Sequence, residues 1–202
     1  MSSRKFRVIK REIRIVGVDD GVFVPHMKGL ADIVGVVFRG GYWLDGVMKT
    51  EVVVDGMDAT EKIAGMIKSS PHYAQIRIVM LNGVTFAGFN VVDIKKLSES
   101  TGLPVIAVTR VKPDFANIRK ALAHLPDGER RWKIIENESV LIRVCSRSGE
   151  EPIVVQVAGM GIEDMERIVK ETSTRSNVPE PLRVAHLIAS GLSKAKLASG
   201  KS

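Results

Sequence analysis

The sequence predicts an α/β fold built on one mixed β-sheet, and three observations lead to this prediction. Three β-branched apolar runs follow one another near the N-terminus with only short links between them. Beyond residue 58, helical and strand periods alternate along the chain. Hydrophobic residues make up 45% of the 202 residues, which is enough for the core of a single domain. The expected element order is β-β-β-α-β-α-β.

The first three strands are expected to form an antiparallel meander. They are read from apolar runs at residues Arg14–Val18, Ala31–Phe38 and Tyr42–Asp55. The first run leads into Asp19, Asp20 and Gly21, and the second ends at Arg39 and two glycines. Because the links are short, hairpin connections are plausible and neighbouring strands should run in opposite directions.

Two helix–strand pairs follow the meander. Asp58 and Glu61 have the spacing of a capping box at the start of the first helix, which is followed by a strand over Ile76–Leu81. A second helix is predicted over Asn90–Thr101, and a strand over Leu103–Val108. A strand that follows a helix in this way normally pairs in parallel through a right-handed crossover. A meander followed by such units is the order of the ribonuclease H-like fold.

The C-terminal half is predicted from weaker patterns. The expected elements are a helix at 115–123, a charged turn at 126–131, a hairpin of 141–144 with 153–157, and helices at 162–171 and 182–192. We expect residues 1–192 to form one domain and the Lys-, Ser- and Gly-rich residues 193–202 to be a disordered basic tail.

Charge and composition limit the classes of partner. The chain has 30 Lys and Arg against 23 Asp and Glu, a net charge of +7, and this favours polyanions such as nucleic acid. Solubility alone is the alternative explanation. Cys145, the single cysteine, lies in an alternating apolar run and is expected to be buried in a strand. The chain has neither a signal peptide pattern nor a long apolar span, so we expect a cytoplasmic protein without a membrane segment.

Acidic residues follow strands at places that can converge in this fold. Carboxylate oxygens suit Mg²⁺ or Mn²⁺, which can clamp the attacking and leaving oxygens in phosphodiester cleavage. Three groups of polar side chains could supply such ligands: Asp19 and Asp20; Asp55, Asp58 and Glu61; and Asn82.

Each of these residues also has a purely structural interpretation. Asp19 and Asp20 can belong to a simple turn, Asp58 can be a helix N-cap, and Asn82 with Gly83 can form a hairpin turn. Asp93 can be an ordinary first-turn helix residue that the helix dipole stabilises.

Four blocks carry a resemblance to a known family. They are Gly17–Gly21, Val54–Thr60, Asn82–Asp93 and Pro179–Gly191. Together they resemble the mainly archaeal domain-of-unknown-function family ninety-nine, a relative of endonuclease V, over essentially the whole chain. Endonuclease V cuts nucleic acid near deaminated purines with Mg²⁺ and three carboxylates, so the resemblance implies a nucleic-acid partner, either DNA or RNA.

The resemblance assigns the three carboxylate positions unequally. The first carboxylate corresponds to Asp19 and the third to Asn82. For the second, Asp58 is the nearest match and Glu61 the next nearest. The resemblance implies an aspartate at the third position, as in endonuclease V and usually in the related family, so this chain departs from both. Asparagine keeps an oxygen but loses a charge, so metal affinity should fall. The Pro-Tyr-Ile-Pro wedge of endonuclease V is also missing, so its inosine specificity does not carry over.

Basic residues are candidates for contacts with phosphate. Arg110 and Lys112 follow a strand after which endonuclease V also carries a basic residue, although a solvated loop explains them equally well. Arg183 could reach a phosphate or could pair with Glu180. The histidines, His186 among them, show no ligand spacing and are interpreted as structural or solvent-facing.

Three hypotheses about function follow. The first is a phosphodiesterase that uses Mg²⁺ or Mn²⁺ bound by Asp19, Asp20 and Asp58, with Asn82 as a weak ligand and with Glu61 and Asp93 as possible auxiliaries. The second is a nucleic-acid-binding protein that does not cleave, and the third is a protein-interaction domain. Asn82 favours the second hypothesis, whereas the paired Asp19 and Asp20 favour the first.

Overall fold

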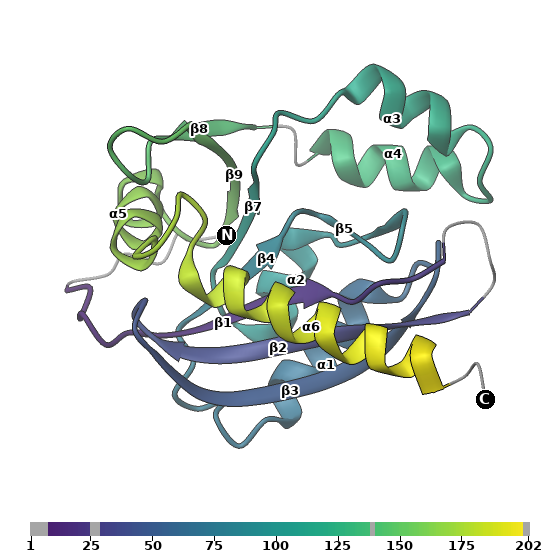
Figure 1. The fold of residues 1–202 in the computed structure, drawn as a ribbon. Helices are drawn as coiled ribbons and strands as arrows, with labels where there is room; N and C mark the ends of the chain where they lie inside the picture. The colour runs from purple at the N-terminus through teal and green to yellow at the C-terminus, as the bar shows by residue number, and fades with distance from the viewer. Residues whose placement is uncertain (1–7, 25–28, 138–139, 200–202) are drawn as a thin grey trace.

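A computed structural model describes residues 8–24, 29–137 and 140–199. Its main feature is a seven-stranded mixed sheet with the order β3-β2-β1-β4-β7-β9-β8 (Figure 1). The strands of this sheet are β1 (Arg14–Asp20), β2 (Leu30–Arg39), β3 (Trp43–Val53), β4 (Ile78–Asn82), β7 (Val105–Thr109), β8 (Ile142–Val144) and β9 (Ile153–Ala158). The predicted α/β class, the meander and the element order of the N-terminal half are confirmed.

Three neighbouring strands in the middle of the sheet run parallel. Val18 of β1 pairs with Leu81 of β4, and Asn82 at the end of β4 pairs with Val108 of β7. The remaining strands pair in antiparallel fashion on either side. Because parallel strands end at the same edge of a sheet, the residues after β1, β4 and β7 lie near one another.

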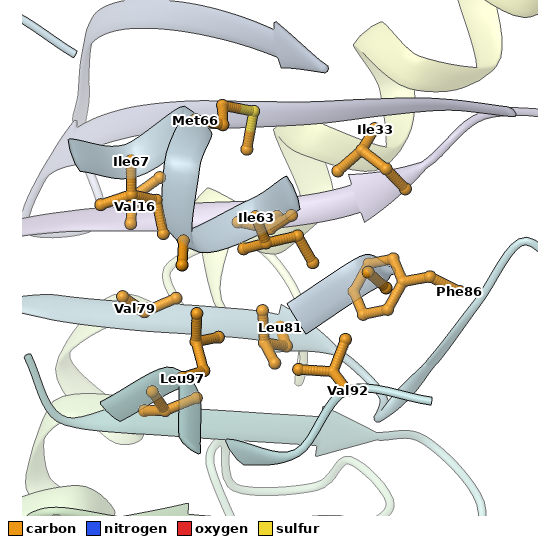
Figure 2. Close-up of a cluster of buried hydrophobic side chains, with 14 of the residues drawn as sticks. Val16, Ile33, Ile63, Met66, Ile67, Val79, Leu81, Phe86, Val92 and Leu97 are labelled. Atoms are coloured by element: carbon orange, nitrogen blue, oxygen red, sulfur yellow. The ribbon is translucent and has the colours of Figure 1, made fainter. Parts of the chain in front are cut away.

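One face of the sheet is covered by α1 (Ala59–Ser69) and α2 (Ile94–Thr101). Side chains from both helices and from alternate strand positions form the larger apolar core, which Figure 2 shows around Ile63, Leu81 and Leu97. Alternation along β1 sends Val16 and Val18 into this core, because successive strand residues point to opposite faces.

The opposite face is covered by α5 (Ile162–Thr172) and the long α6 (Glu180–Ser199), which crosses β1 and β2 (Figure 1). The close crossing depends on Gly17. A Cβ built there would lie 2.5 Å from the carbonyl carbon of Pro181, so any larger residue would push the helix away. The N-terminal part of α6 is thereby held against the middle of β1.

The helices α3 (Phe115–Leu122) and α4 (Gly128–Asn137) pack on each other beyond the end of β7 (Figure 1). The prediction of a charged turn at 126–131 was wrong, because α4 begins within it. Arg131 is buried, and its guanidinium donates hydrogen bonds to the backbone carbonyls of Asp55, Gly56 and Phe89. Arg131, which the sequence suggests is solvated, therefore holds α4 against the segment after β3 and against the residues that follow Phe86.

Three further predictions need correction. The second predicted helix begins at Ile94 and not at Asn90, because Asn90–Val91 (β6) pairs with Thr85–Phe86 (β5) and Asp93 caps the helix. The tail predicted for residues 193–202 is helical as far as Ser199, and its last three residues lie outside the described part of the chain. Cys145 lies after the end of β8 and is exposed, not buried. Within the described ranges, no helix is long and apolar enough to cross a membrane.

Candidate functional site

Asp19 and Asn82 meet at the edge where the parallel strands end. Asp19 follows Ile15 and Gly17 on the face of β1 that α6 covers, and Asn82 follows Ile78 and Met80 on the same face of β4. The side-chain nitrogen of Asn82 donates a hydrogen bond to Oδ2 of Asp19 over 3.0 Å. Oδ1 of Asp19 accepts a second hydrogen bond from the backbone N–H of Asp20. Asp19 is only 2% exposed, so these donors replace water around its carboxylate.

His186 completes this cluster from α6. Its Nδ1 lies 2.8 Å from Oδ2 of Asp19, while 57% of its side-chain surface remains exposed. The interpretation of His186 as merely structural or solvent-facing therefore missed its contact with Asp19. The signal available in the sequence was its position one helical turn after Arg183 in a block that resembles the family. We call Asp19, Asn82 and His186 the strand-end cluster.

Asp20 points to the opposite face of the sheet from Asp19. Its Oδ2 accepts a hydrogen bond from the backbone N–H of Ala87 over 2.6 Å. Burial raises the pKa of Asp20 to about 6; the hydrogen bond from Ala87 acts against this rise and the charge of Asp19 adds to it. Burial also raises the pKa of Asp19, and the hydrogen bonds from Asn82 and His186 oppose that rise. The strand end thus holds two carboxyl groups that resist ionisation.

Asp58 forms its hydrogen bonds at the start of α1, away from the strand-end cluster. Its Oδ1 accepts hydrogen bonds from the side-chain nitrogen of Asn90 over 2.6 Å and from the backbone N–H of Val53 over 3.2 Å. Asn90 in turn accepts from the backbone N–H of Ala59 over 2.9 Å, so Asp58 and Asn90 together fasten the start of α1 to the end of β3. Among the described residues, no hydrogen bond joins Asp58 to the strand-end cluster.

The other acidic candidates also have structural partners. Glu61 forms an ion pair with Lys96, which lowers the pKa of the glutamate. Asp93 caps α2 by accepting from the backbone N–H of Lys96. Oδ1 of Asp55 accepts from the backbone N–H of Phe89. Of the side chains predicted as metal ligands, Asp19 and Asn82 are therefore in contact, whereas Asp58, Glu61 and Asp93 have partners elsewhere.

The donor set does not fit Mg²⁺ or Mn²⁺ as it stands. These ions prefer several oxygen ligands, preferably from more than one carboxylate. In the described ranges, no three His, Cys, Asp or Glu side chains are arranged to hold an ion. Asn82 presents its N–H₂ to Asp19, and His186 contacts the same carboxylate oxygen. Two side chains therefore already contact Oδ2 of Asp19, the oxygen that a cation would need as a ligand.

The basic candidates divide into two groups. Arg183 forms a two-pronged ion pair with Glu180 through contacts of 2.6 and 2.8 Å, as the structural alternative expected. Arg110 and Lys112 follow β7 and are exposed, and both line a pocket beside the β8–β9 hairpin. Of the three, only these two remain available for contacts with phosphate.

Solved structures identify the type of fold. A protein of unknown function from Archaeoglobus fulgidus superposes with a TM-score of 0.78 at 37% identity, over 89% of this chain and 97% of that one. Endonuclease V from Bacillus subtilis gives a TM-score of 0.66 at 13% identity over 98% of this chain and 88% of that one. Endonuclease V from Ciona intestinalis, in complex with DNA that contains inosine, gives 0.60 at 15% identity over 91% and 87%. The fold is therefore ribonuclease H-like, of the endonuclease V type.

Sequence relatives give the family. A UPF0215 protein from Methanosarcina acetivorans is 55% identical over 91% of this chain and 92% of its own length. Another UPF0215 protein, from Methanothermobacter thermautotrophicus, is 52% identical over 95% and 93%. Residues 11–193 match the family described as Endonuclease dU, and this range includes every residue of the strand-end cluster. The chain belongs to the Endonuclease dU family, whose archaeal UPF0215 members are structurally similar to endonuclease V.

Proposed function

We propose that the protein binds nucleic acid across the edge of the sheet where β1, β4 and β7 end, and that its phosphodiesterase activity is weak because Asn82 impairs the metal site at Asp19. One observation carries the second part. The amide nitrogen of Asn82 donates to the buried carboxylate of Asp19, at the position where the resemblance to endonuclease V implies a second carboxylate. This contact satisfies Asp19 without a cation and lowers the gain from binding one.

The charge of the chain and the ligands of its structural neighbours support the first part. The net charge of +7 favours a polyanionic partner. The Ciona endonuclease V, which shares the fold, was solved with DNA that contains inosine. The family description names dU, so DNA with a single deoxyuridine is the first substrate to test, with inosine-containing and undamaged DNA beside it. RNA of the same sequence tests the choice of polymer.

The experiment compares the protein with Asn82→Asp on each substrate, in Mg²⁺ and in Mn²⁺. Binding is measured at low salt and cleavage by gel analysis. We expect both proteins to bind, and cleavage by Asn82→Asp to exceed that of the unchanged protein by about tenfold or more, because a second carboxylate raises metal affinity. Asp19→Asn in the Asn82→Asp background is the control, and it should abolish the gain.

Two results would overturn parts of this proposal. Absence of binding to any polynucleotide at low salt, where electrostatic attraction is strongest, would remove the nucleic-acid function. Binding without any gain of cleavage in Asn82→Asp would favour the alternative function, a nucleic-acid-binding protein that does not cleave. The structural roles of Asp58 and Glu61 favour that alternative, because they leave Asp19 as the one carboxylate of the strand-end cluster, to which Asn82→Asp adds a single further carboxylate.

A further inference from the structure

A pocket of about 770 Å³ lies at the carboxyl end of β7, apart from the strand-end cluster. Its walls come from the segment after β7, from the first residue of α3 and from the β8–β9 hairpin. Pockets of this size are typical of sites for small organic ligands. The side chains on these walls decide which ligand chemistry the pocket would recognise.

Three cations line the pocket: Arg110, Lys112 and Arg143. All three are exposed, and within the described part of the chain none of them forms an ion pair or a side-chain hydrogen bond. One acidic side chain, Glu151, lies on the same lining and reduces the net charge there. The excess of positive charge favours an anion, and Arg and Lys side chains suit a phosphate.

The same pocket has an apolar wall. Val111 is 78% exposed, which is high for a β-branched apolar residue between two cations. Phe115 and Leu141 are half-buried in the lining, and the ring of Phe115 is held edge-on against Trp132 with centroids 6.2 Å apart. Every nucleobase has a flat apolar face that could cover this wall. The phosphate of the same nucleotide would then meet the cations.

The position of the pocket matches the proposed path of a nucleic acid strand. β7 is the second neighbour of β1 in the sheet, and Thr109 at its end lies 3.6 Å from the Cβ position of Gly83. Since neighbouring strands are about 4.8 Å apart, the end of β7 lies about 5 Å from the end of β4, which carries Asn82, and about 10 Å from the end of β1, which carries Asp19. Those separations correspond to a nucleotide close to the one that faces the cluster, not to a remote part of the polymer.

We propose that this pocket binds one nucleotide of an unpaired strand, an inference that rests on the proposed nucleic-acid function. The phosphate lies among Arg110, Lys112 and Arg143, and the base covers Val111, Phe115 and Leu141. The pocket therefore anchors the strand beside the strand-end cluster and requires the bound nucleotide to be out of the base stack. It gives the protein a preference for single-stranded or locally opened nucleic acid.

The test uses two probes of equal charge, deoxyuridine 5′-monophosphate and deoxyribose 5-phosphate, titrated into the full chain by NMR. The nucleotide should bind at least about fivefold more tightly, because only it carries a base. Val111→Ser, a change at an exposed side chain, should bring that ratio toward one. Lys112→Gln combined with Arg143→Gln should weaken both probes. Lys10→Gln removes an exposed cation that precedes β1, at the opposite end of the strands, and should change neither.

Oligonucleotide binding separates failure of the pocket from failure of the proposed function. With a single-stranded oligonucleotide, every phosphate-binding cation that a variant removes should reduce the slope of log affinity against log salt by about 0.7. Strong oligonucleotide binding that the pocket variants leave unchanged would overturn the pocket and leave the function standing. Equal binding of the two small probes would show a phosphate site without a base site and would also overturn the pocket. Nucleotide binding without oligonucleotide binding would overturn the function alone.

Discussion

The side-chain nitrogen of Asn82 lies 3.0 Å from Oδ2 of Asp19 and donates a hydrogen bond to it. The contact joins the ends of two parallel strands and satisfies a carboxylate that is almost fully buried. A carboxylate at position 82 would instead face Asp19 with a second negative charge, and the pair would need a cation or a proton. One amide thus decides whether this strand end is stable alone or depends on a metal ion.

Asn82→Asp should destabilise the protein when no divalent ion is present. We expect a decrease of about 1–3 kcal/mol in the free energy of unfolding at neutral pH, because the hydrogen bond is removed and a repulsion is introduced. Urea denaturation in the presence of a chelator measures it. Asn137→Asp, at the exposed end of α4, makes the same chemical change away from the cluster and should have a smaller effect. Equal decreases in the two variants would contradict a special role for Asn82.

His186→Ala should remove one of the two side-chain partners of Asp19. Because the imidazole is more than half exposed, the expected loss of stability is modest, about 1 kcal/mol. His124→Ala, which replaces another exposed histidine, is the matched control and should be nearly neutral. Thermal unfolding of the two variants side by side makes the measurement, and a neutral His186→Ala would mean that the contact with Asp19 contributes nothing.

Asp20 should make stability depend on pH in a definite direction. Its pKa is raised from 3.8 to about 6 in the folded protein, chiefly by burial, so the folded state holds the proton more tightly than the unfolded state. Its contribution is therefore complete at low pH and is lost as the pH rises from about 4 to about 6. Asp20→Asn cannot ionise, so its stability relative to the unchanged protein should increase over this interval and level off above pH 7, by about 3 kcal/mol in total. A difference that does not vary with pH would show that the pKa of Asp20 is not raised.

Asn90→Ala should affect folding and leave the strand-end cluster intact. The side chain of Asn90 is fully buried and bonds to Asp58, to the carbonyl of Val53 and to the N–H of Ala59. Its removal should cost about 2–4 kcal/mol because buried polar groups are left without partners. In Asn82→Asp, the further change Asn90→Ala should leave metal affinity within about twofold at temperatures where the protein is folded. A large change in metal affinity in either direction would mean that Asp58, whose Oδ1 accepts from Asn90, takes part in the metal site after all.

Much of this arrangement follows from the sequence, and the remainder depends on contacts between distant segments. Alternation along β1 and β4 is enough to place Asp19 and Asn82 on one face of the sheet. The contact with His186 requires knowing that α6 crosses β1 over Gly17, which no local pattern reveals. The Asp58–Asn90 bond joins residues 32 positions apart. Arg131 resembles a surface cation in sequence because its acceptors are backbone carbonyls of other segments.

The central claim is that the amide of Asn82 weakens metal binding at Asp19. Calorimetric titration of Mn²⁺ into the protein and into Asn82→Asp at neutral pH tests this claim most directly. We expect Asn82→Asp to bind Mn²⁺ at least about tenfold more tightly than the unchanged protein, and Asp19→Asn in that background to abolish the binding. Tight Mn²⁺ binding by the unchanged protein that disappears in Asp19→Asn would contradict the claim, because the strand end would then hold a metal despite the amide of Asn82.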